Sequence, residues 1–158
     1  MSRYLHEHAQ PAGPGDARPT AQKVLYDLQL LGKCHHMYAI VTGGTAGIGL
    51  QMVAALHAAS VNVMLGAITV AEGEAAIQNI KREQAELECA GVLKCLPLDL
   101  SKLDSVREFA RLALASLPQQ QLHLLFNHAG ALCCWCCWCY CHGLCCLASV
   151  WVCARGRP

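Results

Sequence analysis

The sequence predicts an α/β fold in which one parallel β-sheet is covered by helices on both faces. Four short apolar runs alternate with segments whose apolar residues recur at helical spacing. The intervening helices of about 10 to 20 residues are long enough for right-handed crossovers between parallel strands. A glycine-rich turn follows the first apolar run directly. With 54% hydrophobic residues, the chain has enough apolar material for the core of one domain.

The first predicted strand, residues 37–41, leads into the turn Thr-Gly-Gly-Thr-Ala-Gly-Ile-Gly at residues 42–49. A helix is expected to begin at Ala46 or Gly47. Glycines let the backbone approach a bulky anion, and a helix N-terminus points free N–H groups at it. The spacing T-G-x-x-x-G-x-G is a variant of the Rossmann dinucleotide-binding fingerprint. Glycines also occur in ordinary tight turns, so the surrounding pattern decides between the two interpretations.

The next two elements continue the alternation of helix and strand. Apolar residues at helical spacing follow the turn, and residues 61–65 form the second predicted strand. Thr69 and Glu72 then have the form of a capping box, in which each side chain satisfies a free N–H group at a helix start. The helix that they open has one face marked by Ile77, Ile80, Gln84 and Leu87.

The third predicted strand, residues 92–98, ends at Asp99, and residues 101–104 resemble a second capping box. Pro118 ends the helix that follows, and residues 122–127 form a fourth strand before Gly130. The pattern is therefore a Rossmann-like β-α-β-α-β-α-β unit with expected strand order 3-2-1-4. In such sheets the ligand lies beyond the carboxyl ends of the strands, where the glycine-rich turn is placed.

These motifs resemble the short-chain dehydrogenase/reductase family over about residues 33 to 132. Besides the glycine-rich turn, Asp99-Leu100 is similar to the family's Asp-hydrophobic pair, and residues 127–130, Asn-His-Ala-Gly, to its Asn-Asn-Ala-Gly segment. Residues 27–33 resemble the lead-in of retinol-dehydrogenase-like and WW-domain-containing oxidoreductase-like members. The resemblance implies an oxidoreductase that transfers a hydride between NAD(P) and an alcohol or carbonyl.

The resemblance also implies a set of residues that bind the nicotinamide dinucleotide. Cofactor choice in the family is read at the end of the second strand, where Ile68 is neither an acid for NAD nor a base for NADP. The cofactor is therefore NADP or NAD, with the preference open. His128 replaces the family's second Asn. The implied contacts are Thr42, Gly43, Gly47, Ile48 and Gly49 at the phosphate turn, Asp99 and Leu100 at the adenine, and Asn127 and Ala129 near the ribose.

No catalytic residue is predicted in these 158 residues. Family members use a Tyr whose pKa is lowered by a Lys four residues further on, together with a Ser that polarises the substrate oxygen. Here none of the four tyrosines is followed at that spacing by a lysine, and the last lysine is Lys102. The chain is accordingly interpreted as the N-terminal, cofactor-binding half of such an enzyme, truncated after the fourth strand and catalytically incompetent. The outer edge of that strand is expected to be unpaired.

A Cys/Trp-rich, low-complexity tail is predicted at residues 133–158, with nine of the chain's 12 cysteines between residues 133 and 153. Its composition fits a CTG-like repetitive tract of codons, which favours an out-of-frame or intron-derived terminus. Two other interpretations remain. Residues 131–154 carry no full charge and are long enough for a membrane span. Cysteine and histidine also recur at zinc-ligand spacing, at Cys133, Cys136, Cys139 and His142.

Three regions follow: a flexible N-terminal arm at 1–33, a partial NAD(P)-binding domain at 34–132, and the tail. The net charge of +1 and the scattered basic residues argue against nucleic-acid binding. The arm has no apolar stretch typical of a signal peptide, and reduced Cys34, Cys89 and Cys95 fit a cytoplasmic protein. The alternative function is a non-catalytic interaction or membrane-tethered protein that uses the tail. His35 and His36 are expected to be surface residues.

Overall fold

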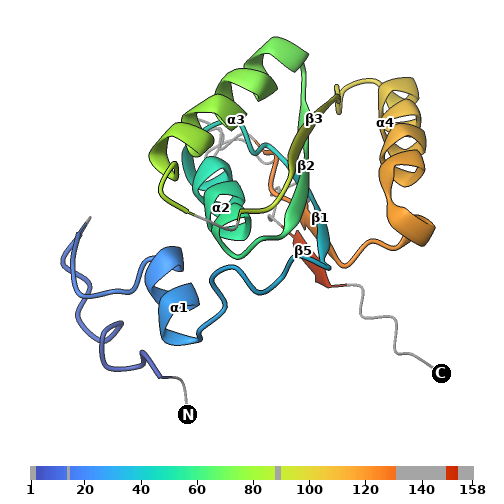
Figure 1. Ribbon diagram of the computed structural model, residues 1–158. Helices are drawn as coiled ribbons and strands as arrows, with labels where there is room; N and C mark the ends of the chain where they lie inside the picture. Colours follow the sequence, from blue (N-terminus) through green and yellow to red (C-terminus); the bar gives the residue numbers. More distant parts are fainter. Residues whose placement is uncertain (1–2, 14, 88–89, 131–148, 153–158) are drawn as a thin grey trace, which may run out of the picture.

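The computed structural model describes residues 3–13, 15–87, 90–130 and 149–152, and its centre is one β-sheet (Figure 1). The strand order is β3-β2-β1-β4-β5, and β1 to β4 pair in parallel, which confirms the predicted order 3-2-1-4. The strands are β1 Tyr38–Thr42, β2 Asn62–Ala67, β3 Leu93–Pro97, β4 Leu124–Asn127 and β5 Ser149–Val152.

The strand register brings the carboxyl ends of the parallel strands together at one edge of the sheet. Thr42 at the end of β1 lies opposite Gly66 of β2 on one side and Asn127 of β4 on the other. Gly66 in turn lies opposite Leu96 of β3. All loops that leave these strands therefore start at the same edge, which is where parallel α/β sheets place their ligand sites.

Helices cover both faces of the sheet, as the sequence predicts (Figure 1). Helices α2 and α3 lie over one face, and α4 lies over the other. Side chains alternate along each strand between the two resulting cores, so that Val41 packs with α2 and α3 whereas Ile40 packs with α4. The helices are α1 Ala21–Asp27, α2 Gly47–Ala58, α3 Val70–Glu83 and α4 Leu103–Ser116, followed by the 3₁₀ turn η1 Pro118–Gln120.

The two predicted capping boxes have different outcomes. Thr69 caps α3 as expected, because its Oγ1 accepts a hydrogen bond from Glu72 N at 3.3 Å. The box predicted at residues 101–104 is wrong, since Lys102 is the N-cap of α4 and makes no side-chain capping bond. The hydroxyl of Ser101 instead donates to Asp99 Oδ1 at 2.6 Å, and an anionic acceptor outcompetes a neutral backbone group for that hydroxyl.

A buried polar pair joins α2 to the end of α3. His57 Nδ1 lies 2.7 Å from Gln84 Oε1, and Gln84 Nε2 donates to Ala54 O at 2.9 Å. Both side chains are buried, with exposed fractions of 4% for His57 and 9% for Gln84. Gln84 therefore lies on the packed face of α3 that the sequence marked, and it is tolerated there because both ends of its amide are hydrogen-bonded.

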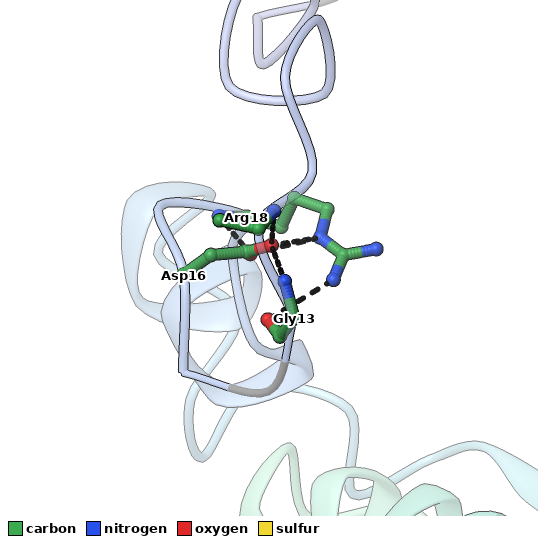
Figure 2. Close-up of polar contacts among 4 residues, drawn as sticks. Gly13, Asp16 and Arg18 are labelled. Atoms are coloured by element: carbon green, nitrogen blue, oxygen red, sulfur yellow. Dashed lines mark hydrogen bonds and ion pairs between the residues drawn. The ribbon is translucent and has the colours of Figure 1, made fainter.

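The segment predicted as an N-terminal arm contains the seven-residue helix α1, capped by Thr20 and packed against α2. Ahead of α1, the carboxylate of Asp16 accepts hydrogen bonds from residues on both sides of it in the chain (Figure 2). It accepts from Gly13 N at 3.1 Å and from Arg18 Nε at 2.8 Å. The hydrogen bond from Arg18 is the main reason that the pKa of Asp16 lies well below its ordinary value. Ala12, Gly13, Asp16 and Arg18 thus have defined polar contacts.

The outer edge of β4 is paired, which corrects the expectation of a free edge. Strand β5 runs antiparallel to β4, with Leu124 opposite Val152 and Asn127 opposite Ser149. An uncovered edge presents unpaired N–H and C=O groups, and β5 satisfies those of β4. The rest of the tail lies outside the described residues, and so do the zinc-ligand and membrane-span interpretations of it. Among the helices that the structure describes, none is long and apolar enough to cross a membrane.

Candidate functional site

The glycine-rich turn leaves the carboxyl end of β1 and enters α2, with a different requirement at each of its glycines. Gly43 has φ +69°, and a Cβ there would lie 2.7 Å from Ala129 Cα. A Cβ on Gly49 would collide with the carbonyl oxygen of Gly43 and lie 2.8 Å from Cδ2 of His128. Gly47 has φ +54°, but a Cβ there would meet nothing within 4 Å. The turn is therefore packed against the segment after β4 on one side and open on the other.

Helix α2 begins at Gly47, as predicted, and its N-cap residue is Ala46. Ala46 has no side-chain acceptor, and no side-chain capping bond forms at this helix start. By helix geometry the first N–H groups of α2 have no acceptor within the helix, and they lie at the positive end of its dipole. An anion placed beside the open side of the turn would meet these N–H groups.

Thr42 ties the end of β1 to the segment after β4. Its Oγ1 accepts a hydrogen bond from Ala129 N at 3.1 Å and donates to Phe126 O at 3.5 Å. The imidazole of His128, which replaces the family's second Asn, lies against Gly49. The segment after β4 is thus held beside the glycine-rich turn by Thr42 and by the packing of His128.

A pocket of about 440 Å³ opens at the carboxyl ends of β1, β2 and β3, next to the turn. Five of the predicted cofactor-binding residues line it, whereas Gly47, Ile48 and Gly49 lie at the turn outside its lining, and Asn127 is exposed at the end of β4. Apolar side chains that are otherwise exposed border it, with Ile68 71% and Leu100 53% exposed. The described residues that line it are Thr42, Gly43, Thr45, Gly66, Ala67, Ile68, Glu72, Leu98, Asp99, Leu100, Ser101 and Ala129.

Asp99 organises the loop between β3 and α4 on the pocket's far wall. Its Oδ1 accepts from Ser101 N at 3.0 Å and from Ser101 Oγ, and its Oδ2 pairs with Lys102 Nζ at 3.0 Å. The hydrogen bond from Ser101, followed by the interaction with Lys102, lowers the pKa of Asp99 from 3.8 to about 2. The backbone N–H of Asp99 donates to Ser105 Oγ at 2.9 Å. Asp99 is therefore an anion at neutral pH, held by its own loop.

Glu72 lines the same pocket, although the sequence indicated only a capping role for it. Thr45 Oγ1 donates to Glu72 Oε1 at 3.1 Å and so links the glycine-rich turn to the first turn of α3. In the predicted capping box the Glu72 carboxylate would accept a hydrogen bond from the backbone N–H of Thr69. It accepts one from Thr45 instead. The two residues are 27 positions apart, and no periodic signal in the sequence pairs them.

Outside this pocket, the described residues offer few other candidate functional groups. Across residues 3–13, 15–87, 90–130 and 149–152, no group of three or more His, Cys, Asp or Glu side chains is placed to hold a metal ion. The four zinc-spaced tail residues lie outside these ranges. His35 and His36 are exposed, as expected, with their rings edge to face at 5.8 Å. The described cysteines Cys34 and Cys95 are free thiols.

The fold and the turn are those of a Rossmann-like α/β domain, and comparison with known families places it more closely. Residues 37–136 match the short chain dehydrogenase family. The chain therefore belongs to that family, which confirms the resemblance that the sequence motifs carried.

Curated relatives extend the match toward the N-terminus. The chain is 32% identical over 132 residues to the short-chain dehydrogenase/reductase prx1 of Penicillium rubens, a match that covers 84% of this chain and 36% of the relative. It is 36% identical over 108 residues to retinol dehydrogenase 12 of Bos taurus, covering 68% of this chain and 31% of the relative. The chain thus spans about a third of the length of these relatives.

Solved structures of the same family share the fold. A metagenomic short-chain oxidoreductase in complex with NADP is 27% identical, with a TM-score of 0.52 over 63% of this chain and 41% of that one. An NADPH-bound short-chain oxidoreductase from Pseudomonas aeruginosa PAO1, with an atypical catalytic centre, is 28% identical, with a TM-score of 0.53 over 62% and 36% of the two chains. Both of these relatives hold a nicotinamide dinucleotide.

Proposed function

We propose that this chain binds a nicotinamide dinucleotide, NAD or NADP, through the glycine-rich turn and the adjoining pocket. The observation that carries the proposal is the open side of the turn. Gly47 has φ +54° and free space where a Cβ would be, and α2 starts there without a side-chain cap. A pyrophosphate needs this combination of bare backbone and helix N-terminus.

The residues around the turn fit the adenosine half of the cofactor. In the proposal, Gly43, Gly47, Ile48 and Gly49 hold the phosphates, with Thr42 maintaining the turn through its bond to Ala129. Asp99 and Leu100 border the adenine, for which the exposed apolar surface of Leu100 beside the pocket is suitable. Asn127 and Ala129, at the end of β4, lie toward the ribose.

The proposal concerns cofactor binding without substrate turnover by these 158 residues. In the family, the bound nicotinamide accepts or donates a hydride while a Tyr-Lys pair and a Ser handle the substrate oxygen. The residues four positions after Tyr4, Tyr26, Tyr38 and Tyr140 are His8, Leu30, Thr42 and Leu144. A phenol without a nearby cation has a pKa near 10 and is a poor proton donor or acceptor at neutral pH. We therefore expect no oxidation of alcohols or reduction of carbonyls by this chain alone.

Titration of the purified, reduced protein with NADH and NADPH tests the proposal, with nicotinamide fluorescence and thermal stabilisation as readouts. Gly47→Trp fills the open side of the turn and should abolish saturable binding. The matched control is Gly15→Trp, because Gly15 also has a positive φ, +84°, with nothing within 4 Å of a Cβ, and lies in the N-terminal segment. Saturable binding that only the Gly47 variant loses supports the proposal. No binding by a folded wild-type chain would refute it.

The alternative function is an interaction or membrane tether that uses the tail. Strand β5 limits this alternative, because residues 149–152 of the tail pair with β4 and cannot at the same time lie in a membrane. A tether would have to release this strand or use other residues of the tail. The free thiols of Cys34 and Cys95 are in keeping with a cytoplasmic location for the domain. Fractionation separates the two functions: a tethered chain should pellet with membranes and resist extraction by high salt, whereas a cofactor-binding chain alone should stay in the supernatant.

A further inference from the structure

We propose that the site discriminates against a 2′-phosphate and takes NAD(H) in preference to NADP(H), with Glu72 as the specificity-determining residue. This inference rests on the proposed dinucleotide-binding function. It departs from the NADP and NADPH seen in the two structural relatives, and it follows from the charges that border the pocket of this chain.

Among the residues that the structure describes, the pocket is bordered by two carboxylates and by no cationic side chain. Glu72 and Asp99 are the ionisable residues of this described lining, and it contains no Lys, Arg or His. The nearest candidate cation in sequence, Lys102, is bound to Asp99 Oδ2 at 3.0 Å. Its charge is thus already compensated within the loop between β3 and α4. A 2′-phosphate placed beside Glu72 would therefore meet negative charge, with no cationic side chain in the described lining to compensate it.

The position that usually reads the ribose carries no charge here. Ile68, directly after β2, is apolar and 71% exposed at the pocket rim. Glu72 lies four residues further on, in the first turn of α3, and Thr45 Oγ1 of the glycine-rich turn donates a hydrogen bond to its Oε1 at 3.1 Å. The fold therefore restores an acid to this side of the pocket from the first turn of α3 instead of from the end of β2.

The chemistry of the two cofactors makes this acid selective. NAD carries a ribose 2′-hydroxyl, which can donate a hydrogen bond to a carboxylate, and a carboxylate bonded once by Thr45 retains further acceptor capacity. NADP carries a phosphate there, with a charge of about −1.5 to −2 at neutral pH, by analogy with other phosphate monoesters. That phosphate accepts hydrogen bonds and repels Glu72. Repulsion from one carboxylate at such a partly exposed site corresponds to about a tenfold change in an equilibrium constant.

Calorimetric titration with NAD⁺ and with NADP⁺ tests the inference on the full chain under reducing conditions. We expect the wild-type Kd for NAD⁺ to be lower by about tenfold or more. Glu72→Gln should bring the two Kd values within about threefold of each other, mainly by tightening NADP⁺ binding. Ile68→Arg should reverse the preference, because a guanidinium is suited to a phosphate. Glu74→Gln is the matched control, since Glu74 is exposed on the same helix and outside the pocket lining, and it should leave the ratio unchanged.

The outcomes separate this inference from the function on which it rests. If both dinucleotides bind with equal Kd, or NADP⁺ binds more tightly, the preference is wrong while dinucleotide binding stands. A ratio that Glu72→Gln leaves unchanged overturns the role of Glu72. If a chain shown by circular dichroism to be folded binds neither dinucleotide, the proposed function fails and the inference fails with it. Added salt should shrink the wild-type ratio, because Glu72 is solvent-exposed and its repulsion is screened.

Discussion

Replacing Gln84 by Met tests the buried polar pair that joins α2 to α3. Met has a similar volume and no amide, so the variant removes the contacts to His57 Nδ1 and to Ala54 O with little change in packing. Because an amide oxygen only accepts, His57 Nδ1 carries the proton in this pair and becomes an unsatisfied buried donor in the variant. The exposed fraction of 4% at His57 leaves little access for water to replace the lost partner.

The expected loss in the free energy of unfolding is about 1.5–4.5 kcal/mol. An unsatisfied buried donor costs about 1–3 kcal/mol, and the second lost hydrogen bond adds about 0.5–1.5 kcal/mol. With the urea dependence typical of small domains, the unfolding midpoint should fall by roughly 1–2 M. Circular dichroism during urea unfolding of the reduced protein measures this shift.

The control is Gln78→Met on the same helix, since Gln78 is exposed and a surface substitution of this kind changes stability by less than about 0.5 kcal/mol. If Gln84→Met unfolds at the same urea concentration as the wild type and the control, the pair does not stabilise the contact between α2 and α3, and the reasoning is refuted.

Two further predictions concern the pocket walls. The pKa of Asp99 is lowered in the folded state from 3.8 to about 2, so its stabilising contribution is fully present above about pH 4 and is lost as the pH falls toward 2. Urea midpoints measured across this range should decline less steeply for Asp99→Asn, and parallel slopes would contradict the assignment. Thr42→Val should cost about 1–3 kcal/mol because the N–H of Ala129 loses its acceptor, whereas Thr42→Ser should retain it. Faster hydrogen exchange at Ala129 in the Val variant alone is the expected result.

Local signals in the sequence predict most of this fold. The order of strands and helices follows from apolar periodicity, and the start of α2 from the glycine-rich turn. The sequence predicts Thr69 as an N-cap because its partner, Glu72 N, lies three residues away, within the range that a capping motif specifies. These features depend on residues that are close together in the chain, so a sequence pattern can predict them.

The contacts that sequence reasoning missed join distant residues or depend on a competition between partners. Ser101 has the spacing of a cap, but Asp99 offers its hydroxyl a charged acceptor, and no motif ranks the two. Thr45 and Glu72 meet only because two parallel strands end side by side. The binding roles of all nine predicted contact residues remain predictions, although the structure places these residues around one edge of the sheet.

Strand β5 determines whether a further strand can pair with the β4 edge of the sheet. A domain of this kind grows by adding a further parallel strand, which needs a free edge and a crossover connection. On the β4 side that edge is occupied in the opposite direction by residues 149–152. A strand from another polypeptide could pair with β4 only after displacing β5. The rate of this exchange would be limited by the release of residues 149–152. Fragment complementation by this chain would therefore be slow and competitive, and it would accelerate if residues 149–152 were removed.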